Sequence, residues 1–165
     1  MVNLSALKKM DVETRYKYML TLIEGQLSSE KDIYANISNT TAIIYAIIEK
    51  LNWCGFYFLR EEELVLGPFQ GLPACNRIVI GKGVCGTSVS ERKIYRVGNV
   101  HEFPGHIACD SASNSEIVLP LIKDGKIYGV LDIDSYEFDN FTELEERYLI
   151  RVVEKLNQYI QWEQL

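Results

Sequence analysis

Three of the four cysteines lie in segments that do not follow the apolar pattern of a protein core. Cys109 stands in the polar run His106–Ser111, Cys85 lies inside a glycine-rich turn, and Cys75 lies in the proline-containing loop Leu72–Cys75. A polar and accessible setting favours a reactive thiolate over an inert buried thiol. These cysteines therefore indicate thiol redox chemistry, with Cys109 as a candidate nucleophile.

The fourth cysteine and the spacing of all four bear on the redox compartment. Cys54 shares a strand face with Phe56 and Phe58, so we interpret it as a small buried apolar side chain. The chain has no CxxC pair and too few cysteines for a disulfide scaffold of its length. Its first ten residues lack the long apolar region and the cleavage site of a secretory leader. We therefore expect a cytoplasmic protein in which any cysteine pair is catalytic or regulatory.

Two carboxylates follow each other at strand spacing. Asp132 and Asp134 lie two residues apart and project from one face, while Leu131 and Ile133 project into the presumed core. A solvated sheet face is the ordinary interpretation, but Glu116, at the start of the partner strand, favours a three-carboxylate cluster. Such a cluster could hold an ammonium group or a metal ion, or keep one member protonated as an acid. A metal is the weaker alternative because no histidine accompanies the carboxylates at a ligand spacing, and we expect none.

Two aromatic residues, Trp53 and Tyr57, fall on the same face of one predicted strand. Two such residues usually belong to a core. The sharper alternative is a wall that recognises a small apolar group on a ligand.

Both histidines, His101 and His106, lie in the irregular segment 98–115. A histidine in such a segment usually stabilises the loop by hydrogen bonding. A Cys-His dyad or a Ser-His-Asp triad stays open, although no nucleophile-elbow motif supports either.

The run Gly81–Gly86 matches the GxGxxG pattern of dinucleotide-binding turns. Such a site opens a series of parallel βαβ units, whereas this run lies mid-chain among short strands and precedes an antiparallel hairpin. We therefore interpret it as a structural turn that leads from a strand into a possible helix over 84–91.

The elements that must position these residues are helices at both ends and strands between them. Apolar spacing predicts helices over 12–27 and 31–51, and a third helix after a Thr142–Glu145 capping box. Alternation predicts strands over 53–60, 64–66 and 77–80, and a hairpin of 117–123 and 126–135 around Asp124-Gly125. Pro120 cannot donate to a ladder, so its strand should lie at an edge or carry a bulge. The pattern predicts an α+β domain with a mainly antiparallel sheet, helices from both termini on one face, and a ligand pocket on the other.

Length and charge narrow the possible functions. The 165 residues are expected to form one domain, 1–165, and a net charge of -6 opposes binding to a phosphate backbone. The longest apolar stretch, 41–48, falls far short of the roughly 20 residues that span a bilayer. We therefore expect neither a nucleic-acid partner nor a membrane partner.

Six blocks of the sequence together carry a family likeness. They are Trp53–Tyr57, Leu66–Gly71, Gly83–Gly86, His106–Asp110, Ser113–Pro120 and Gly129–Ser135. These blocks resemble the free methionine-(R)-sulfoxide reductases, which are single-domain enzymes of the GAF fold. The likeness runs from about residue 16 to residue 156, and its cysteine motifs are specific because GAF sensor domains generally lack them.

The resemblance implies a GAF-like fold and the thiol-dependent reduction of free methionine-(R)-sulfoxide. It implies that Cys109 is the nucleophile and that Cys75 or Cys85 resolves the sulfenic acid that forms on it. It further implies recycling of the resulting disulfide by thioredoxin or dithiothreitol, no other cofactor, and a homodimer. The residues implied to bind and activate the substrate are Glu116, Asp132 and Asp134, with Trp53 and Tyr57 lining the pocket for its methylthio end.

This chemistry agrees with the residue types. A sulfoxide sulfur becomes electrophilic once its oxygen is protonated or hydrogen-bonded, so its reduction needs a thiolate, an acid and a second thiol. Free methionine also carries an ammonium group that anionic side chains can select. Two alternatives are a GAF module that senses a small molecule and a thiol redox switch without turnover. We expect a single domain of 165 residues without an effector domain, and this expectation favours the enzyme.

Overall fold

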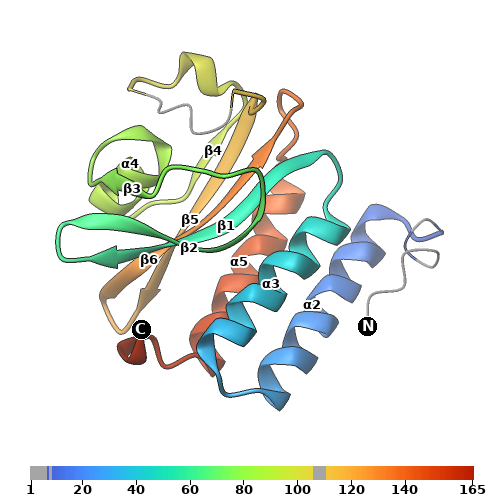
Figure 1. Ribbon diagram of the computed structural model, residues 1–165. Helices are drawn as coiled ribbons and strands as arrows, with labels where there is room; N and C mark the ends of the chain where they lie inside the picture. The colour runs from blue at the N-terminus through green and yellow to red at the C-terminus, as the bar shows by residue number, and fades with distance from the viewer. Residues whose placement is uncertain (1–6, 8, 106–110) are drawn as a thin grey trace.

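A six-stranded antiparallel sheet forms the centre of the molecule (Figure 1). The computed structural model describes Leu7 and residues 9–105 and 111–165. Across the sheet the strands follow the order β3-β2-β1-β6-β5-β4, so β1 and β6 lie side by side at the centre. The strands are β1 (Leu51–Arg60), β2 (Glu63–Gly71), β3 (Arg77–Val79), β4 (Tyr95–Val97), β5 (Ser115–Lys123) and β6 (Lys126–Ser135).

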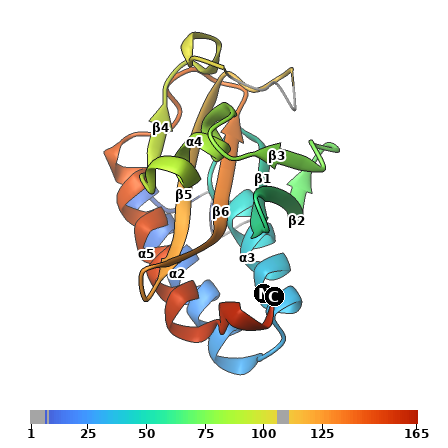
Figure 2. The same ribbon diagram turned by 90° about the vertical axis from the view of Figure 1, so that its left-hand side faces the viewer.

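Three long helices cover one face of this sheet (Figures 1 and 2). They are α2 (Val12–Ser29), α3 (Ile33–Ile47) and α5 (Glu143–Tyr159), and their apolar faces form the main core with alternate residues of the strands. Leu131 and Ile133 are fully buried in this core, as predicted. Cys54 is a free thiol and is also fully buried there, which confirms its interpretation as a small apolar side chain.

Side-chain caps fix where these helices begin. The carboxylate of Asp32 accepts a hydrogen bond from the backbone N–H of Ala35 at the start of α3. The predicted capping box of Thr142 and Glu145 is present at the start of α5. Because α3 ends at Ile47, it is shorter than the predicted helix 31–51. The remaining residues of that apolar pattern lead into β1.

The predicted hairpin of β5 and β6 is present. Asp124 and Gly125 have φ angles of 51° and 77°, the positive values that a tight two-residue turn needs. Pro120 lies in β5, which stands between β6 and β4 rather than at the edge of the sheet. However, β4 pairs only with Glu116–Val118, so β5 has no neighbouring strand on that side at Pro120. The sequence did not predict β4 because three residues show no clear alternation.

A fourth helix, α4 (Gly83–Glu91), packs against the opposite face of the sheet (Figure 2). Its residues Val84, Cys85 and Val89 join a second apolar cluster that includes Trp53 and Tyr57. The predicted α+β architecture, with helices from both termini on one face, is therefore confirmed. The second face is less open than predicted because α4 covers part of it.

The glycine-rich run forms the turn between β3 and α4. Because β3 pairs antiparallel with β2, this run opens no parallel βαβ unit, and the dinucleotide interpretation is excluded. A Cβ atom on Gly86 would lie 2.4 Å from the carbonyl oxygen of Val79, so this position has no room for a side chain. The glycine therefore has a packing role, as expected for a structural turn.

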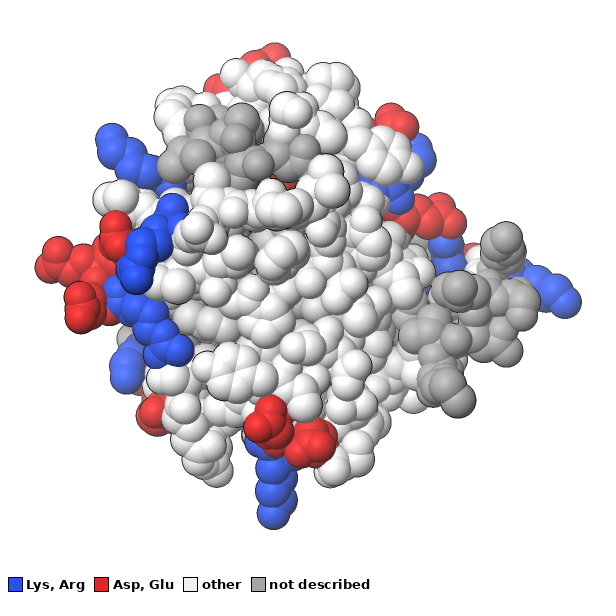
Figure 3. Space-filling view, in the orientation of Figure 1, with Lys and Arg blue, Asp and Glu red and all other residues white. Residues whose placement is uncertain are grey.

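The charged side chains on one face of the molecule lie at its margins, and the middle of that face is uncharged (Figure 3). Helix α3 carries no Lys, Arg, Asp or Glu between Ile33 and Ile47.

Across the parts of the chain that the structure describes, no helix combines the length and apolar character needed to cross a membrane.

Candidate active site

The three candidate carboxylates project from the sheet face that α4 packs against. Glu116 of β5 and Trp53 of β1 both pair with Asp134 of β6, one from each side. Asp132 lies opposite Gly55, two residues earlier on β6, so its side chain projects from the same face. Glu116 and Asp132 are each only 6% exposed, whereas Asp134 is partly exposed. The solvated sheet face proposed as the ordinary interpretation of Asp132 and Asp134 is therefore wrong for Asp132.

Burial and mutual repulsion favour protons on this cluster. Burial raises the pKa of Glu116 well above its ordinary value, and the nearby charges of Asp132 and Asp134 raise it further. Burial also raises the pKa of Asp132 to about 6, although hydrogen bonds with Cys85 and Glu116 oppose the rise. The cluster can therefore keep a neutral carboxylic acid at neutral pH, which is the form that donates a proton.

One carboxylate oxygen of the cluster has no hydrogen-bond partner in the part of the chain that the structure describes. Asp132 Oδ1 is buried, and none of the described residues donates a hydrogen bond to it. A buried acceptor without a donor costs on the order of 1–3 kcal/mol of folding free energy. This oxygen is therefore available to accept a hydrogen bond or a cation from a ligand.

Cys85 lies against the same carboxylates. It stands in the first turn of α4, is 3% exposed, and its Sγ is 3.9 Å from Glu116 Oε1. Burial raises the pKa of the Cys85 thiol well above its ordinary value, and the charges of Asp132 and Glu116 add to the rise. The sequence identified Cys85 as a loop cysteine and did not place it beside the carboxylates.

Cys75 lies in the loop between β2 and β3, which the two aromatic side chains of β1 contact. It is disulfide-bonded, in contrast to the free thiols of Cys54 and Cys85. The Tyr57 hydroxyl donates a 2.9 Å hydrogen bond to the Cys75 carbonyl, and Trp53 Nε1 donates one of 3.2 Å to the Leu72 carbonyl. The polar tips of both aromatics therefore support the loop that carries Cys75.

The aromatic side chains themselves form a stacked row. The ring centroid of Trp53 lies 5.8 Å from the ring centroid of Tyr57 and 5.4 Å from that of Phe69. A Cβ atom on Gly55 would lie 2.4 Å from the Trp53 indole, so glycine at this position leaves room for the ring. Phe69 was not singled out in the sequence, because alternation predicted a strand only over 64–66, whereas β2 extends to Gly71.

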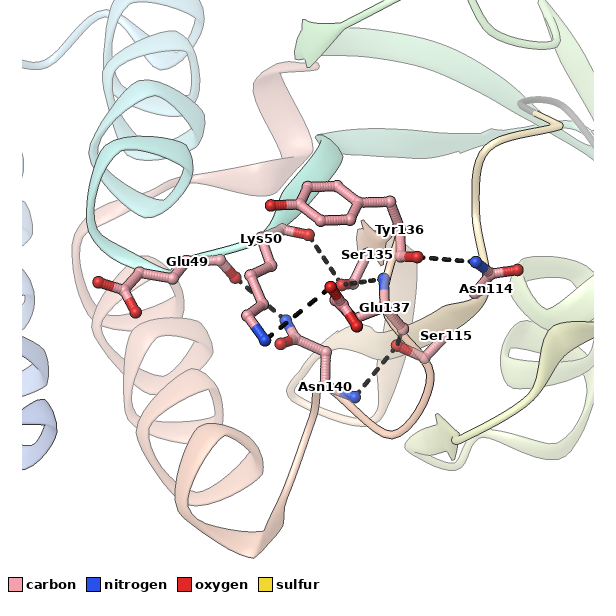
Figure 4. Close-up of polar contacts among 8 residues, drawn as sticks. All are labelled: Glu49, Lys50, Asn114, Ser115, Ser135, Tyr136, Glu137 and Asn140. Carbon is pink, nitrogen blue, oxygen red and sulfur yellow. Dashed lines mark hydrogen bonds and ion pairs between the residues drawn. The ribbon is translucent and has the colours of Figure 1, made fainter.

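Two buried serines anchor the ends of β5 and β6 (Figure 4). Ser135 Oγ donates a 2.8 Å hydrogen bond to the Lys50 carbonyl and accepts one of 3.1 Å from the Glu137 N–H. Ser115 Oγ donates a 2.7 Å hydrogen bond to the Glu137 carbonyl and accepts one of 3.3 Å from the Asn140 N–H. These bonds tie both strand ends to the segment that follows β6, and they tie the end of β6 to Lys50, the residue before β1.

The two serines are sequence neighbours of the carboxylates. Ser115 precedes Glu116, and Ser135 follows Asp134. The serine network therefore fixes the strand ends from which Glu116 and Asp134 project. Sequence reasoning missed this support, although a small polar residue at each strand end was a usable signal.

His101 is the histidine that the structure describes, and it stabilises a loop through Asn114. His101 Nε2 lies 2.9 Å from Asn114 Oδ1, and Asn114 Nδ2 donates a 2.7 Å hydrogen bond to the Tyr136 carbonyl (Figure 4). His101 therefore has the loop-stabilising role that the sequence favoured. His106 and the candidate nucleophile Cys109 lie outside the described residues.

Comparisons with known proteins identify the family. The GAF domain profile matches residues 35–160. Protein YtsP of Bacillus subtilis is 52% identical over 148 residues, which cover 88% of this chain and 91% of that protein. The free methionine-R-sulfoxide reductase of Escherichia coli is 49% identical over 134 residues, 81% of each chain. This chain belongs to the free methionine-R-sulfoxide reductases of the GAF domain family.

A solved structure agrees with the assignment to the free methionine-R-sulfoxide reductases. The X-ray structure of that reductase from Neisseria meningitidis, in complex with its substrate, has a TM-score of 0.88 and 40% sequence identity. The match covers 94% of this chain and 93% of that one. The family resemblance seen in the sequence is therefore confirmed over nearly the whole chain.

Proposed function

We propose that this chain reduces free methionine-(R)-sulfoxide to methionine with electrons from thiols. The named activity of the Escherichia coli and yeast relatives, at 49% and 40% identity, supports this proposal. The observation that carries it is the buried pair of Glu116 and Asp132, which provides an acid and an unpartnered acceptor oxygen on one sheet face.

The carboxylates and aromatics bind the two ends of the substrate. Asp132 and Asp134 face the ammonium group, which free methionine has and a peptide-bound methionine lacks. Trp53 and Tyr57 line the space for the methyl group on sulfur. Low solvent exposure around Asp132 supports this arrangement because a charge pair gains strength where water is excluded.

The first chemical step transfers oxygen from the substrate to a thiol. Cys109 attacks the sulfoxide sulfur as a thiolate while Glu116 donates a proton to the sulfoxide oxygen. The attack forms a bond between the Cys109 sulfur and the substrate sulfur. The hydroxyl group then moves to the Cys109 sulfur as the substrate's sulfur–oxygen bond and the new sulfur–sulfur bond break, so methionine leaves and Cys109 becomes a sulfenic acid. The raised pKa of Glu116 supports its role as the proton donor.

The second step removes the sulfenic acid. The Cys75 thiol attacks the sulfur of Cys109, a disulfide forms, and the oxygen leaves as water. We assign this resolving role to Cys75 rather than Cys85, because Cys75 is disulfide-bonded while Cys85 is a free, buried thiol with a raised pKa. A dithiol reductant then restores both thiols, so the cycle balances without a resident cofactor. Thioredoxin as that reductant and the homodimer stay predictions.

A direct assay tests the proposal. The purified, reduced protein is mixed with dithiothreitol and each diastereomer of free methionine sulfoxide, and methionine is measured by amino-acid analysis. We expect methionine from the R form and none above background from the S form. If neither diastereomer is reduced, the chain is a ligand-binding GAF module or a redox switch, and the proposal is wrong.

A further inference from the structure

A thiol and two carboxylates meet in the buried cluster with the geometry of a metal site. Cys85, Glu116 and Asp132 are all buried, and one potential ligand atom from each lies within 4.8 Å of the other two. They come from the first turn of α4 and from the neighbouring strands β5 and β6. Asp132 adds an independent sign of a missing ligand, because its buried Oδ1 has no partner among the described residues.

We propose that the reduced protein binds a thiophilic divalent cation, with Zn²⁺ as the type, through Cys85 Sγ and the carboxylates of Glu116 and Asp132. Sequence analysis disfavoured a metal because no histidine accompanied the carboxylates. In the folded structure, Cys85 supplies the non-carboxylate ligand that the sequence lacked. It lies 31 residues from Glu116 in the sequence, so its spacing did not indicate this contact.

The distance between two of the three ligand atoms is close to the value that this cation needs. With tetrahedral Zn²⁺, a thiolate sulfur and a carboxylate oxygen lie about 3.5 Å apart. Cys85 Sγ and Glu116 Oε1 are 3.9 Å apart, so a movement of a few tenths of an ångström brings them into place. Three protein ligands leave one tetrahedral position for water, as in zinc sites that stay open to a ligand.

The ligand types set the selectivity. A thiolate favours Zn²⁺, Co²⁺ or Cd²⁺, whereas Mg²⁺ and Ca²⁺ prefer sites made of oxygen alone. Zn²⁺ displaces the thiol proton of Cys85 when it binds. One thiolate and two carboxylates carry a charge of -3, which a divalent ion largely neutralises. Asp134, on the same strand face, is partly exposed and marks the side from which the ion can enter.

The cation and the proposed substrate use the same carboxylates. On the proposed function, the ammonium group of free methionine sulfoxide contacts Asp132, so Zn²⁺ and substrate exclude each other. The metal is therefore an inhibitor of the reductase rather than a cofactor. Binding of the metal itself does not require that the chain turns over any substrate.

Binding is tested on the full chain, kept reduced with a phosphine that does not chelate metals. Zn²⁺ affinity is measured by calorimetry, and Co²⁺ binding is followed by its thiolate-to-metal charge-transfer absorption. We expect one ion per chain, and we expect Cys85→Ser to abolish the charge-transfer absorption. Both Cys85→Ser and Asp132→Asn should weaken Zn²⁺ binding by at least about tenfold.

Two matched controls keep the assignment specific. The double variant Cys75→Ser, Cys109→Ser retains Cys85 and should bind Zn²⁺ as the parent does. Asp124→Asn changes an exposed carboxylate in the hairpin turn and should also bind normally. If Cys85→Ser does not fold, the double variant and Asp132→Asn still test the site. Failure of the parent to bind Zn²⁺, or equal binding by the Asp132→Asn variant, overturns the proposal.

Competition separates this inference from the proposed function. We expect free methionine-(R)-sulfoxide to reduce the apparent Zn²⁺ affinity in the double variant, which cannot turn it over. Zn²⁺ binding that depends on Cys85 but is unaffected by methionine sulfoxide would confirm the metal site. The same result would overturn the placement of the substrate ammonium in the proposed function.

Discussion

The hydroxyl of Tyr57 donates a 2.9 Å hydrogen bond to the backbone carbonyl of Cys75. This bond joins a side chain on the central strand β1 to the loop that carries the disulfide-bonded cysteine. Trp53 supports the same loop through the Leu72 carbonyl, and its ring stacks on Tyr57. A side chain proposed to contact the substrate is therefore also in direct contact with the loop proposed to resolve the sulfenic acid.

The first prediction concerns this hydrogen bond. Tyr57→Phe keeps the aromatic ring and removes the donor to the Cys75 carbonyl. A single hydrogen bond contributes about 1 kcal/mol, so we expect disulfide formation after the first turnover to slow by roughly fivefold. Rapid-quench measurement of methionine release and of free thiols separates the first turnover from disulfide formation.

The matched control is Tyr95→Phe, which removes a hydroxyl that donates to Glu91 at the protein surface. It should form the disulfide at the parent rate. A Tyr57→Phe variant that forms its disulfide as fast as the parent shows that the bond does not position the Cys75 loop.

The second prediction separates the roles of the cysteines. Cys109→Ser should abolish reduction even with excess dithiothreitol, because no reductant replaces the nucleophilic sulfur. Cys75→Ser should release one methionine per active site and then stop under thioredoxin, since the resolving thiol acts after methionine has left. The buried thiol of Cys85 predicts a smaller loss of thioredoxin-supported turnover in Cys85→Ser.

Single-turnover and steady-state assays of the three variants check these roles. Sustained turnover by Cys109→Ser would reassign the nucleophile. A larger steady-state loss in Cys85→Ser than in Cys75→Ser would transfer the resolving role to Cys85, despite its raised pKa.

The period-two pattern predicted the shared face of Asp132 and Asp134, and the strand partner of β6 brought Glu116 to them as expected. These three positions were predictable from local patterns, because alternation along each strand and the register of the β5–β6 hairpin are enough to place the carboxylates on one face. The sequence could not predict that Cys85 joins them, because that contact depends on how α4 packs across the sheet. The residues that pack against Cys85 in the folded structure decide whether its thiol is accessible. The glycine-rich composition around Cys85 predicted an accessible thiol, whereas the folded structure buries it.

Other parts of the site were hidden for related reasons. Tyr57 and Trp53 donate their hydrogen bonds to main-chain carbonyls of the Cys75 loop. Every residue has such a carbonyl, so the residue types in the loop do not indicate these bonds. Phe69 was overlooked because the alternation in β2 breaks at Gly67 and Pro68. The helices and the hairpin were predictable since their caps, apolar spacing and turn residues are local signals.

The third prediction concerns the stability cost of the buried carboxylates. Burial raises the pKa of Asp132 from an ordinary value of 3.8 to about 6. The folded state therefore binds this proton more tightly than the unfolded chain does. Its contribution to stability is greatest below about pH 4 and is lost as the pH rises to about 6.

Asp132→Asn should remove the loss of stability that accompanies ionisation of Asp132. We expect the variant to gain stability relative to the parent as the pH rises from about 4 to about 7, on the order of 2–3 kcal/mol. Urea unfolding at several pH values measures the difference, with Asp124→Asn as the exposed control. The same variant should lose much of kcat/KM, because the charge that faces the substrate is gone. A pH-independent stability difference would show that burial does not raise the pKa of Asp132.

The last prediction concerns which substrate the site accepts. N-acetylmethionine sulfoxide lacks the ammonium charge and adds bulk at the end that faces Asp132 and Asp134. Asp132 is 6% exposed, so water cannot replace the missing cation at that carboxylate. Loss of one buried charged partner typically costs about 2–5 kcal/mol, so kcat/KM should fall at least roughly thirtyfold relative to free methionine-(R)-sulfoxide. Asp134→Asn provides the internal comparison, because removing the protein charge should narrow the gap between the two substrates. Equal kcat/KM values in the parent would mean that the carboxylates do not recognise the amine, and the chain would then act on methionine sulfoxide without selecting the free amino acid.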